Sequence, residues 1–199
     1  MLTFQNGSDT AIIVLHEIYG INRHMREVCE EYAAAGYDVY CPDLLAGRCF
    51  DYAQQQDAYE FFMKAVGFEV YSSINDLIRQ LRPKYRKIIL LGFSAGATVA
   101  WRCAESGLCD GIIGRYGSRI RDYTMLAPKC PALLIFADRE ESFDPASLAA
   151  ELKSKPNVTA VLLNGSHGFC DPFSAGYNPA SAAQAEERMK KFLHDVRSV

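Results

Sequence analysis

The chain has 199 residues, of which 49% are hydrophobic and 23% charged, and its formal net charge is −3. These values are typical of a soluble globular protein, and we expect one α/β domain over residues 1–199. The near balance of charge and the absence of a basic run argue against nucleic acid as a partner, and no apolar run approaches the roughly 20 residues that a membrane helix needs.

The seven cysteines stand at irregular spacings that suit no zinc site. The first residues, Met1 to Gly7, lack a basic segment followed by an apolar core, so they do not have the pattern of a signal peptide. We therefore expect a cytoplasmic protein with reduced cysteines, several of them buried as small apolar residues.

Short apolar runs alternate with helical patterns along the whole chain. This alternation predicts a mostly parallel central sheet that is covered by helices on both faces. Ligands of such sheets bind at the carboxyl ends of the strands, so the residues that follow each strand are candidates for a site. The predicted strands are 10–16, 37–41, 87–91, 109–116, 132–137 and 158–163, and the predicted helices are 23–35, 53–65, 68–82, 95–104, 145–154 and 180–196.

The motif Gly92-Phe93-Ser94-Ala95-Gly96 joins an aliphatic strand pattern to a helical one. Gly-x-Ser-x-Gly in this context predicts a nucleophile elbow, a tight turn that exposes a serine hydroxyl beside a helix N-terminus. The two glycines leave out side chains that would clash in the turn, and the serine adopts a strained backbone conformation. Ser94 is therefore the candidate nucleophile. An ordinary strand-to-helix turn is the alternative.

A serine hydroxyl needs a base within hydrogen-bond reach, and in this type of fold the histidine follows the acid in chain order. His167 lies between Gly165 and Gly168 just after the last predicted strand, and it is the candidate base. His194 falls near the end of an amphipathic helix, where we expect exposure to solvent. His16 and His24 precede the nucleophile, and we expect them to be packing and surface residues.

The acid is expected in the loop after the strand 132–137. Glu140 is the first candidate, because hydrolases of this fold usually place the acid three residues past a small residue that closes the strand, here Ala137. Asp138 is the runner-up because it is nearest to the strand end. Glu141 and Asp144 remain as further alternatives.

Two backbone N–H groups are candidates for stabilising an oxyanion. The N–H of Ala95 follows the nucleophile, and the N–H of Ile18 lies in the loop after the strand 10–16. Glu17 points into the same region, where a carboxylate could hold the nucleophile at rest or act as a second base.

Three stretches of the chain together resemble the dienelactone hydrolase family of the α/β-hydrolase fold. His16–Gly20 resembles the family's glutamate segment, Gly92–Gly96 its elbow, and Gly165–Phe169, with Tyr177 beyond it, the histidine loop. The resemblance extends over about residues 10–195.

This resemblance implies a hydrolase, for which we expect no metal or organic cofactor, and the short chain is expected to leave no room for a lid domain. The implied roles are nucleophile for Ser94, base for His167, acid for Glu140 or Asp138, resting-state partner for Glu17, and oxyanion donors for Ile18 and Ala95.

The sequence departs from the family at two positions that bear on function. The best-known members have cysteine at the elbow, whereas this chain has Ser94, and an alcohol is too weak an acid to leave its proton with a glutamate. Members that cleave dienelactone have an arginine four residues after the histidine, and Asp171 stands there in this chain. An anionic lactone is therefore disfavoured as substrate, unless one of three other arginines binds it: Arg48, Arg115 or Arg119.

The sequence thus predicts a serine hydrolase that cleaves a small carboxylic ester or lactone through an acyl-enzyme. A thioesterase or another acyl hydrolase would use the same residues, so the sequence leaves these alternatives open. A ligand-binding protein without turnover is a further alternative. It is favoured over a hydrolase if no carboxylate of residues 138–144 reaches His167. The sequence does not predict an oligomeric state.

Overall fold

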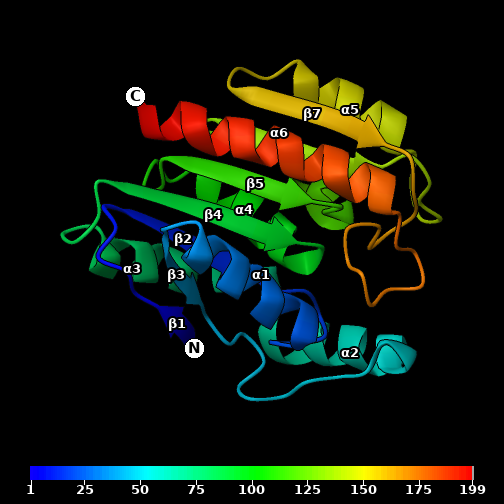
Figure 1. The fold of residues 1–199 in the computed structure, drawn as a ribbon. Coiled ribbons are helices and arrows are strands. Elements are labelled where there is room, and N and C mark those ends of the chain that lie inside the picture. The colour runs from blue at the N-terminus through cyan, green and yellow to red at the C-terminus, as the bar shows by residue number, and fades with distance from the viewer. Residues whose placement is uncertain (199) are drawn as a thin grey trace.

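The computed structural model describes residues 1–198 and arranges seven strands in one twisted sheet (Figure 1). The sheet order is β1-β3-β2-β4-β5-β6-β7, and only β1 runs antiparallel to its neighbour. All of the predicted strands are present. The structure adds β1, which the sequence does not predict because its three residues are too few to show a periodic pattern. The strands are β1 Leu2–Phe4, β2 Thr10–Leu15, β3 Asp38–Cys41, β4 Lys87–Phe93, β5 Gly111–Arg115, β6 Ala132–Ala137 and β7 Val158–Leu163.

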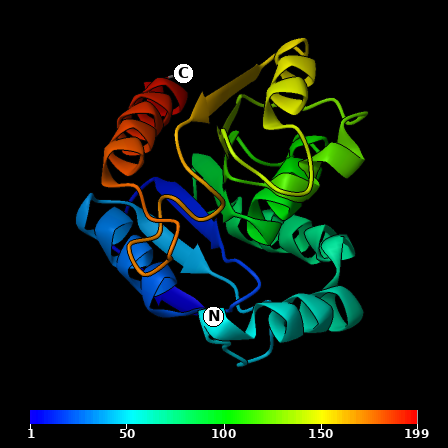
Figure 2. The same ribbon diagram turned by 90° about the vertical axis from the view of Figure 1, so that its right-hand side faces the viewer.

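Helices cover both faces of the sheet, as the alternating pattern predicts (Figure 2). α1 and α6 pack on one face, and α3, α4 and α5 pack on the other. Among residues 1–198, no helix is both long and apolar enough to cross a membrane. The α-helices are α1 Arg23–Ala34, α2 Gln55–Phe61, α3 Tyr71–Leu81, α4 Ala95–Ala104, α5 Pro145–Lys153 and α6 Pro179–Ser198.

The segment between β3 and α3 differs from the single helix predicted at 53–65. It consists of the 3-10 helix η1 (Tyr52–Gln54), α2, the π-helix η2 (Phe62–Val66) and the 3-10 helix η3 (Phe68–Val70). The helix widens at its end because the N–H of Gly67 donates to the Phe62 carbonyl, five residues back, at 2.7 Å. This irregular segment borders the site described below.

Parallel register brings the carboxyl ends of the central strands to one edge of the sheet. Leu15 pairs with Gly92 and Phe93 pairs with Arg115, so the loops after β2, β4 and β5 begin side by side. Ala137 pairs with Leu163, which places the loops after β6 and β7 next to each other. The strand ends thus gather segments that are as far as 150 residues apart in sequence.

The elbow depends on the small size of both its glycines. A Cβ on Gly96 would lie 2.1 Å from the Leu15 carbonyl oxygen, and a Cβ on Gly92 would lie 2.3 Å from the Gly96 carbonyl oxygen. Both distances are far shorter than a carbon–oxygen contact allows. The first turn of α4 can therefore lie directly against the end of β2 only with glycine at these positions, as the motif predicts.

Replacing Gly96 with alanine tests this close approach. We expect Gly96→Ala to lower the free energy of unfolding by about 3 kcal/mol, because the backbone of α4 or β2 must shift to admit the methyl group. Gly7→Ala is a control without a steric contact: Gly7 has a positive φ of 76°, unlike Gly96, and no atom would lie within 4 Å of its added Cβ. We expect about 1 kcal/mol there from backbone strain alone. Urea unfolding of both variants measures the difference, and equal losses would contradict the steric explanation.

Candidate active site

Ser94 occupies the tight turn between β4 and α4. Its φ of 49° and ψ of −111° are rare for a residue with a side chain, which agrees with the strained elbow that the motif predicts. Its N–H donates to the Arg115 carbonyl at 2.9 Å, and its carbonyl accepts from Ala97 and Thr98 in the first turn of α4. These bonds hold the backbone in the strained conformation and leave the hydroxyl facing a pocket.

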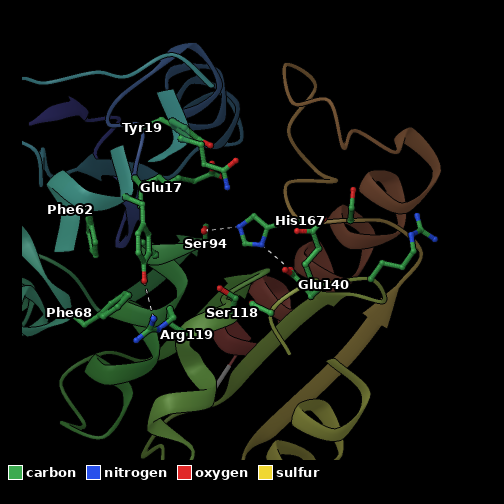
Figure 3. A pocket seen from close by; sticks show the side chains of 17 residues that line it. Glu17, Tyr19, Phe62, Phe68, Ser94, Ser118, Arg119, Glu140 and His167 are labelled. Carbon is green, nitrogen blue, oxygen red and sulfur yellow. Dashed lines mark hydrogen bonds and ion pairs between the residues drawn. The ribbon is translucent and has the colours of Figure 1, made fainter. Parts of the chain in front are cut away.

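A continuous chain of hydrogen bonds joins Ser94, His167 and Glu140 (Figure 3). Nε2 of His167 lies 2.8 Å from Oγ of Ser94, and Nδ1 lies 2.8 Å from Oε1 of Glu140. The Glu140 side chain is only 7% exposed, whereas the His167 side chain is 40% exposed along its edge. The structure therefore brings together three residues that come from the loops after β4, β6 and β7.

The other carboxylates of the loop 138–144 do not reach His167. Asp138 accepts a hydrogen bond from the N–H of Gly165 at 2.9 Å, so it fastens the start of the histidine loop. Asp144 caps α5 by accepting from Ala146 and Ser147, and Glu141 lines the pocket. The spacing from the strand end and the observed geometry thus both favour Glu140. Asp138, the residue nearest to the strand end, instead holds the histidine loop in place.

The surroundings of His167 favour its charged form. Burial of the ring lowers its pKa, but the hydrogen bond and the charge of Glu140 outweigh this effect, and the charge of Glu17 adds to it. The pKa of His167 is therefore raised above its usual value. A histidine in this environment can accept a proton and hold it while Glu140 stabilises the imidazolium.

Ile18 and Ala95 line the pocket beside Ser94, as expected for the two predicted oxyanion donors. Ala95 is the first residue of α4, so its N–H has no acceptor within the helix. Ile18 follows β2, whose last residue pairs with Gly92 next to the elbow. The positive end of the α4 dipole lies at the same place and favours negative charge there.

Glu17 also lines this pocket but is not bonded to the nucleophile. It is only 5% exposed, and its Oε1 has no hydrogen-bond partner among residues 1–198. Burial raises its pKa above the usual value, the charges of His24 and His167 lower it, and that of Asp171 raises it further, so the net direction is upward. The Ser94 hydroxyl pairs with His167 instead.

Asp171, which replaces the family's arginine, is buried in a polar cluster behind the site. The Tyr52 hydroxyl donates a short hydrogen bond to it, Nδ1 of His24 lies 3.3 Å from it, and the N–H of Phe173 donates to it at 2.8 Å. Burial alone would raise the pKa of Asp171, but its contacts with His24 and Tyr52 hold it below the usual value. The cluster ties the histidine loop to α1 and η1.

The histidines outside the hydrogen-bonded chain differ in their exposure and their contacts. The expectation of a surface position is wrong for His24, which is 3% exposed and supports Asp171. His16 is fully buried and lies between the Glu17 carbonyl, 2.6 Å from Nδ1, and the Leu44 N–H, which donates to Nε2 at 3.0 Å. His194 is exposed, as expected.

Tyr116 is a residue of the site that the sequence analysis does not identify. It is fully buried after β5 with a φ of 42°, and its ring lies 5.2 Å from that of His167 and 5.8 Å from that of Phe169. Its hydroxyl has no hydrogen-bond partner among residues 1–198. The ring packs against the imidazole at an interplanar angle of 59°. Its position directly after a strand is the one signal that could have indicated it.

The pocket above Ser94 has a volume of about 440 Å³, which suits a small organic molecule. Of the three arginines considered as anion-binding residues, only Arg119 lines it. Arg115 is buried on the α6 side, 2.7 Å from Glu186, and the Arg48 guanidinium lies over the Phe61 ring at 4.6 Å. Figure 3 shows Arg119 with Phe62 and Phe68 on one side of Ser94, and His167 and Glu140 on the other.

Comparison with known proteins places the chain in a family. The model of the dienelactone hydrolase family matches residues 2–197, so the chain belongs to that family, and it is a hydrolase that acts on esters. The Bacillus subtilis protein YczH is 38% identical over 173 residues, which cover 85% of each chain. Carboxymethylenebutenolidase of Pseudomonas putida is 27% identical over 207 residues, covering 94% of this chain and 86% of the relative.

The α/β-hydrolase fold is shared with solved structures. An esterase of Pyrococcus furiosus superposes with a TM-score of 0.71 at 19% sequence identity, covering 98% of this chain and 84% of the other. The mostly parallel seven-stranded sheet with helices on both faces is the common architecture. The predicted fold class is therefore confirmed.

The contact between Glu140 and His167 can be tested without an activity assay. We expect Glu140→Gln to lower the pKa of His167 by about one unit or more, because the variant removes the negative charge that stabilises the imidazolium. Glu141→Gln is the matched control and should leave that pKa nearly unchanged. NMR titration of the imidazole Cε1 proton measures both. A pKa unchanged in Glu140→Gln would contradict the ion pair.

Proposed function

We propose that the protein is a serine hydrolase that cleaves small carboxylic esters or lactones through an acyl-enzyme. The observation that carries this proposal is the pair of 2.8 Å contacts from Ser94 to His167 and from His167 to Glu140. A nucleophile, a base and an acid in this order form the arrangement that activates an alcohol for attack on a carbonyl.

The mechanism follows from the positions of these groups. Ser94 Oγ attacks the substrate carbonyl while Nε2 of His167 accepts its proton, and Glu140 stabilises the resulting imidazolium. The N–H groups of Ala95 and Ile18 stabilise the oxyanion. His167 then gives its proton to the leaving alcohol. A water molecule, deprotonated by His167, attacks the acyl-enzyme and releases the acid and the free Ser94 hydroxyl.

Glu17 has a different role here from the resting-state partner that the family resemblance implies. A negatively charged Glu17 next to the oxyanion would oppose the charge that develops in the transition state. Burial shifts the pKa of Glu17 upward, which reduces that repulsion. We assign Glu17 the role of a polar wall of the pocket, with His167 as the base.

The position of Asp171 bears on the charge of the substrate that the pocket would accept. The relative from Pseudomonas putida is named carboxymethylenebutenolidase. In this chain a buried carboxylate stands where dienelactone-cleaving members have an arginine, and it is already engaged by His24 and Tyr52. An anionic lactone would gain no countercharge from this position, so we favour an uncharged ester or lactone. Thioesters would react by the same steps.

A serine-directed fluorophosphonate tests the activation of Ser94. We expect one adduct per native chain by intact mass, no adduct on Ser94→Ala, and labelling of His167→Ala that is slower by at least about a hundredfold, because the base contributes roughly 10²–10⁴ in rate. Ser174→Ala is a matched control outside the hydrogen-bonded chain and should label like the native protein. A native protein without adduct would contradict an activated serine and favour a ligand-binding protein.

Two substitutions separate the acid from its runner-up. We expect Glu140→Gln to lower kcat for a short ester by about 10³- to 10⁴-fold, the loss typical when the acid that orients the base is replaced by an amide. Asp138→Asn keeps an oxygen that can accept from Gly165, so its kcat should stay within about threefold of native. Steady-state kinetics on one ester measures both. A large loss in Asp138→Asn with little change in Glu140→Gln would reverse the assignment.

A further inference from the structure

The pocket has two chemically different sides, divided by Ser94. One side is aromatic and is formed by Tyr59, Phe62 and Phe68, from α2, η2 and η3. Phe62 is fully buried and Phe68 is 6% exposed, and their ring centroids lie 5.3 Å apart. The lining also includes polar and charged residues of the loops that carry Glu140 and His167, namely Arg139, Glu141, Ser142 and Ser166. The two sides would contact different halves of an ester.

The catalytic geometry decides which half lies on which side. His167 must protonate the leaving alcohol, so the alcohol half lies on the side of His167. The carbonyl oxygen must point to the N–H groups of Ile18 and Ala95. The acyl group takes the remaining direction, away from His167, where Figure 3 shows Phe62 and Phe68. The acyl half therefore contacts the aromatic side, and the alcohol half contacts the polar side.

A polar pair, Arg119 and Tyr59, lies beside Phe68. Nη1 of Arg119 donates to the Tyr59 hydroxyl at 2.9 Å, and Nε of Arg119 donates to Asp122 at 2.5 Å. The hydrogen bonds of residues 1–198 include none from Nη2 of Arg119 and none donated by the Tyr59 hydroxyl. Two donors are thus available at this end of the pocket, and the Arg119 side chain is 33% exposed.

Hydrogen-bonding capacity selects the kind of group that these donors would bind. Asp122 lies 2.5 Å from Arg119 and 3.9 Å from Arg121, so it offsets part of the positive charge there. An oxygen acceptor, such as a phenolic hydroxyl or a methoxy oxygen, matches the free donors of Arg119 and Tyr59. The Arg119 guanidinium lies 5.9 Å from the centroid of the Phe68 ring, so these donors lie beside an aromatic surface, which favours a flat aromatic group.

We propose that the preferred substrates are esters of oxygen-substituted aryl-alkyl acids with a small hydrophilic alcohol. The aryl ring packs against Phe68 and Tyr59, and its ring oxygen accepts hydrogen bonds from Tyr59 and Arg119. Water cleaves the acyl-enzyme C–O bond, so the products are the aryl-alkyl acid and the alcohol. This proposal rests on the proposed function, because the direction of the acyl group follows from the role of His167.

An isomeric pair of esters tests the orientation. Methyl 3-phenylpropanoate carries its ring on the acyl half, and 2-phenylethyl acetate has the same atoms with the ring on the alcohol half. We expect kcat/KM to be at least about tenfold higher for the first ester, because only its ring reaches the aromatic side. An equal or reversed preference in an active enzyme would overturn the proposal.

A second comparison tests the polar end. We expect methyl 3-(4-hydroxyphenyl)propanoate to exceed methyl 3-phenylpropanoate in kcat/KM by about tenfold in the native enzyme, and Tyr59→Phe and Arg119→Gln each to remove most of this advantage. Activity on both esters should change less than about threefold in Tyr71→Phe. Tyr71→Phe is the matched control, since its hydroxyl has no hydrogen bond among residues 1–198 and does not line the pocket.

The outcomes distinguish this proposal from the proposed function. Loss of every ester activity in the native protein, together with absent fluorophosphonate labelling, contradicts the serine hydrolase itself. Normal labelling with a preference for aliphatic acyl groups, or a hydroxyl advantage that persists in both Tyr59→Phe and Arg119→Gln, overturns only the substrate class.

Discussion

The close contact between the first turn of α4 and the end of β2 is the constraint on which the site depends. It requires glycine at positions 92 and 96, and it holds Ser94 at a positive φ. The same contact places the N–H of Ala95 beside the loop that carries Ile18 and Glu17. The candidate nucleophile and the candidate oxyanion donors therefore come from one packing arrangement, and a shift of α4 would disturb both together.

The base and the acid are held by a second set of contacts on the other side of the elbow. Pairing of β6 with β7 brings their following loops together, and the bond from Gly165 to Asp138 fastens the histidine loop to the acid loop. The rest of the histidine loop is anchored through Asp171 to His24 and Tyr52. Asp171 thus has a structural place in this chain, and the anion-binding role of the family's arginine is absent there.

Electrostatics around the nucleophile follow from this packing. Glu140 is buried beside His167 and stabilises its charged form. Glu17 is buried, its Oε1 has no hydrogen-bond partner among residues 1–198, and burial shifts its pKa upward. The two glutamates of the site therefore have different contacts: Glu140 pairs with the imidazole, and Glu17 lines the pocket.

Sequence alone predicted the sheet and the strained turn at Ser94, because each is encoded locally, and it indicated His167 as the candidate base. Apolar runs alternate with helical patterns, Gly92 and Gly96 flank Ser94, and His167 follows the last strand. The place of Glu140 was favoured by spacing, yet four carboxylates stand within seven residues, and only the fold shows which one reaches His167.

Other features of the site were decided by tertiary structure. His24 is buried because Asp171, 147 residues away in sequence, lies against it, and Tyr116 reaches His167 because β5 pairs with β4. The aromatic and polar sides of the pocket likewise come from η-helices and loops whose conformation has no periodic pattern. Local sequence patterns determine which elements form, whereas contacts between distant segments determine which side chains meet.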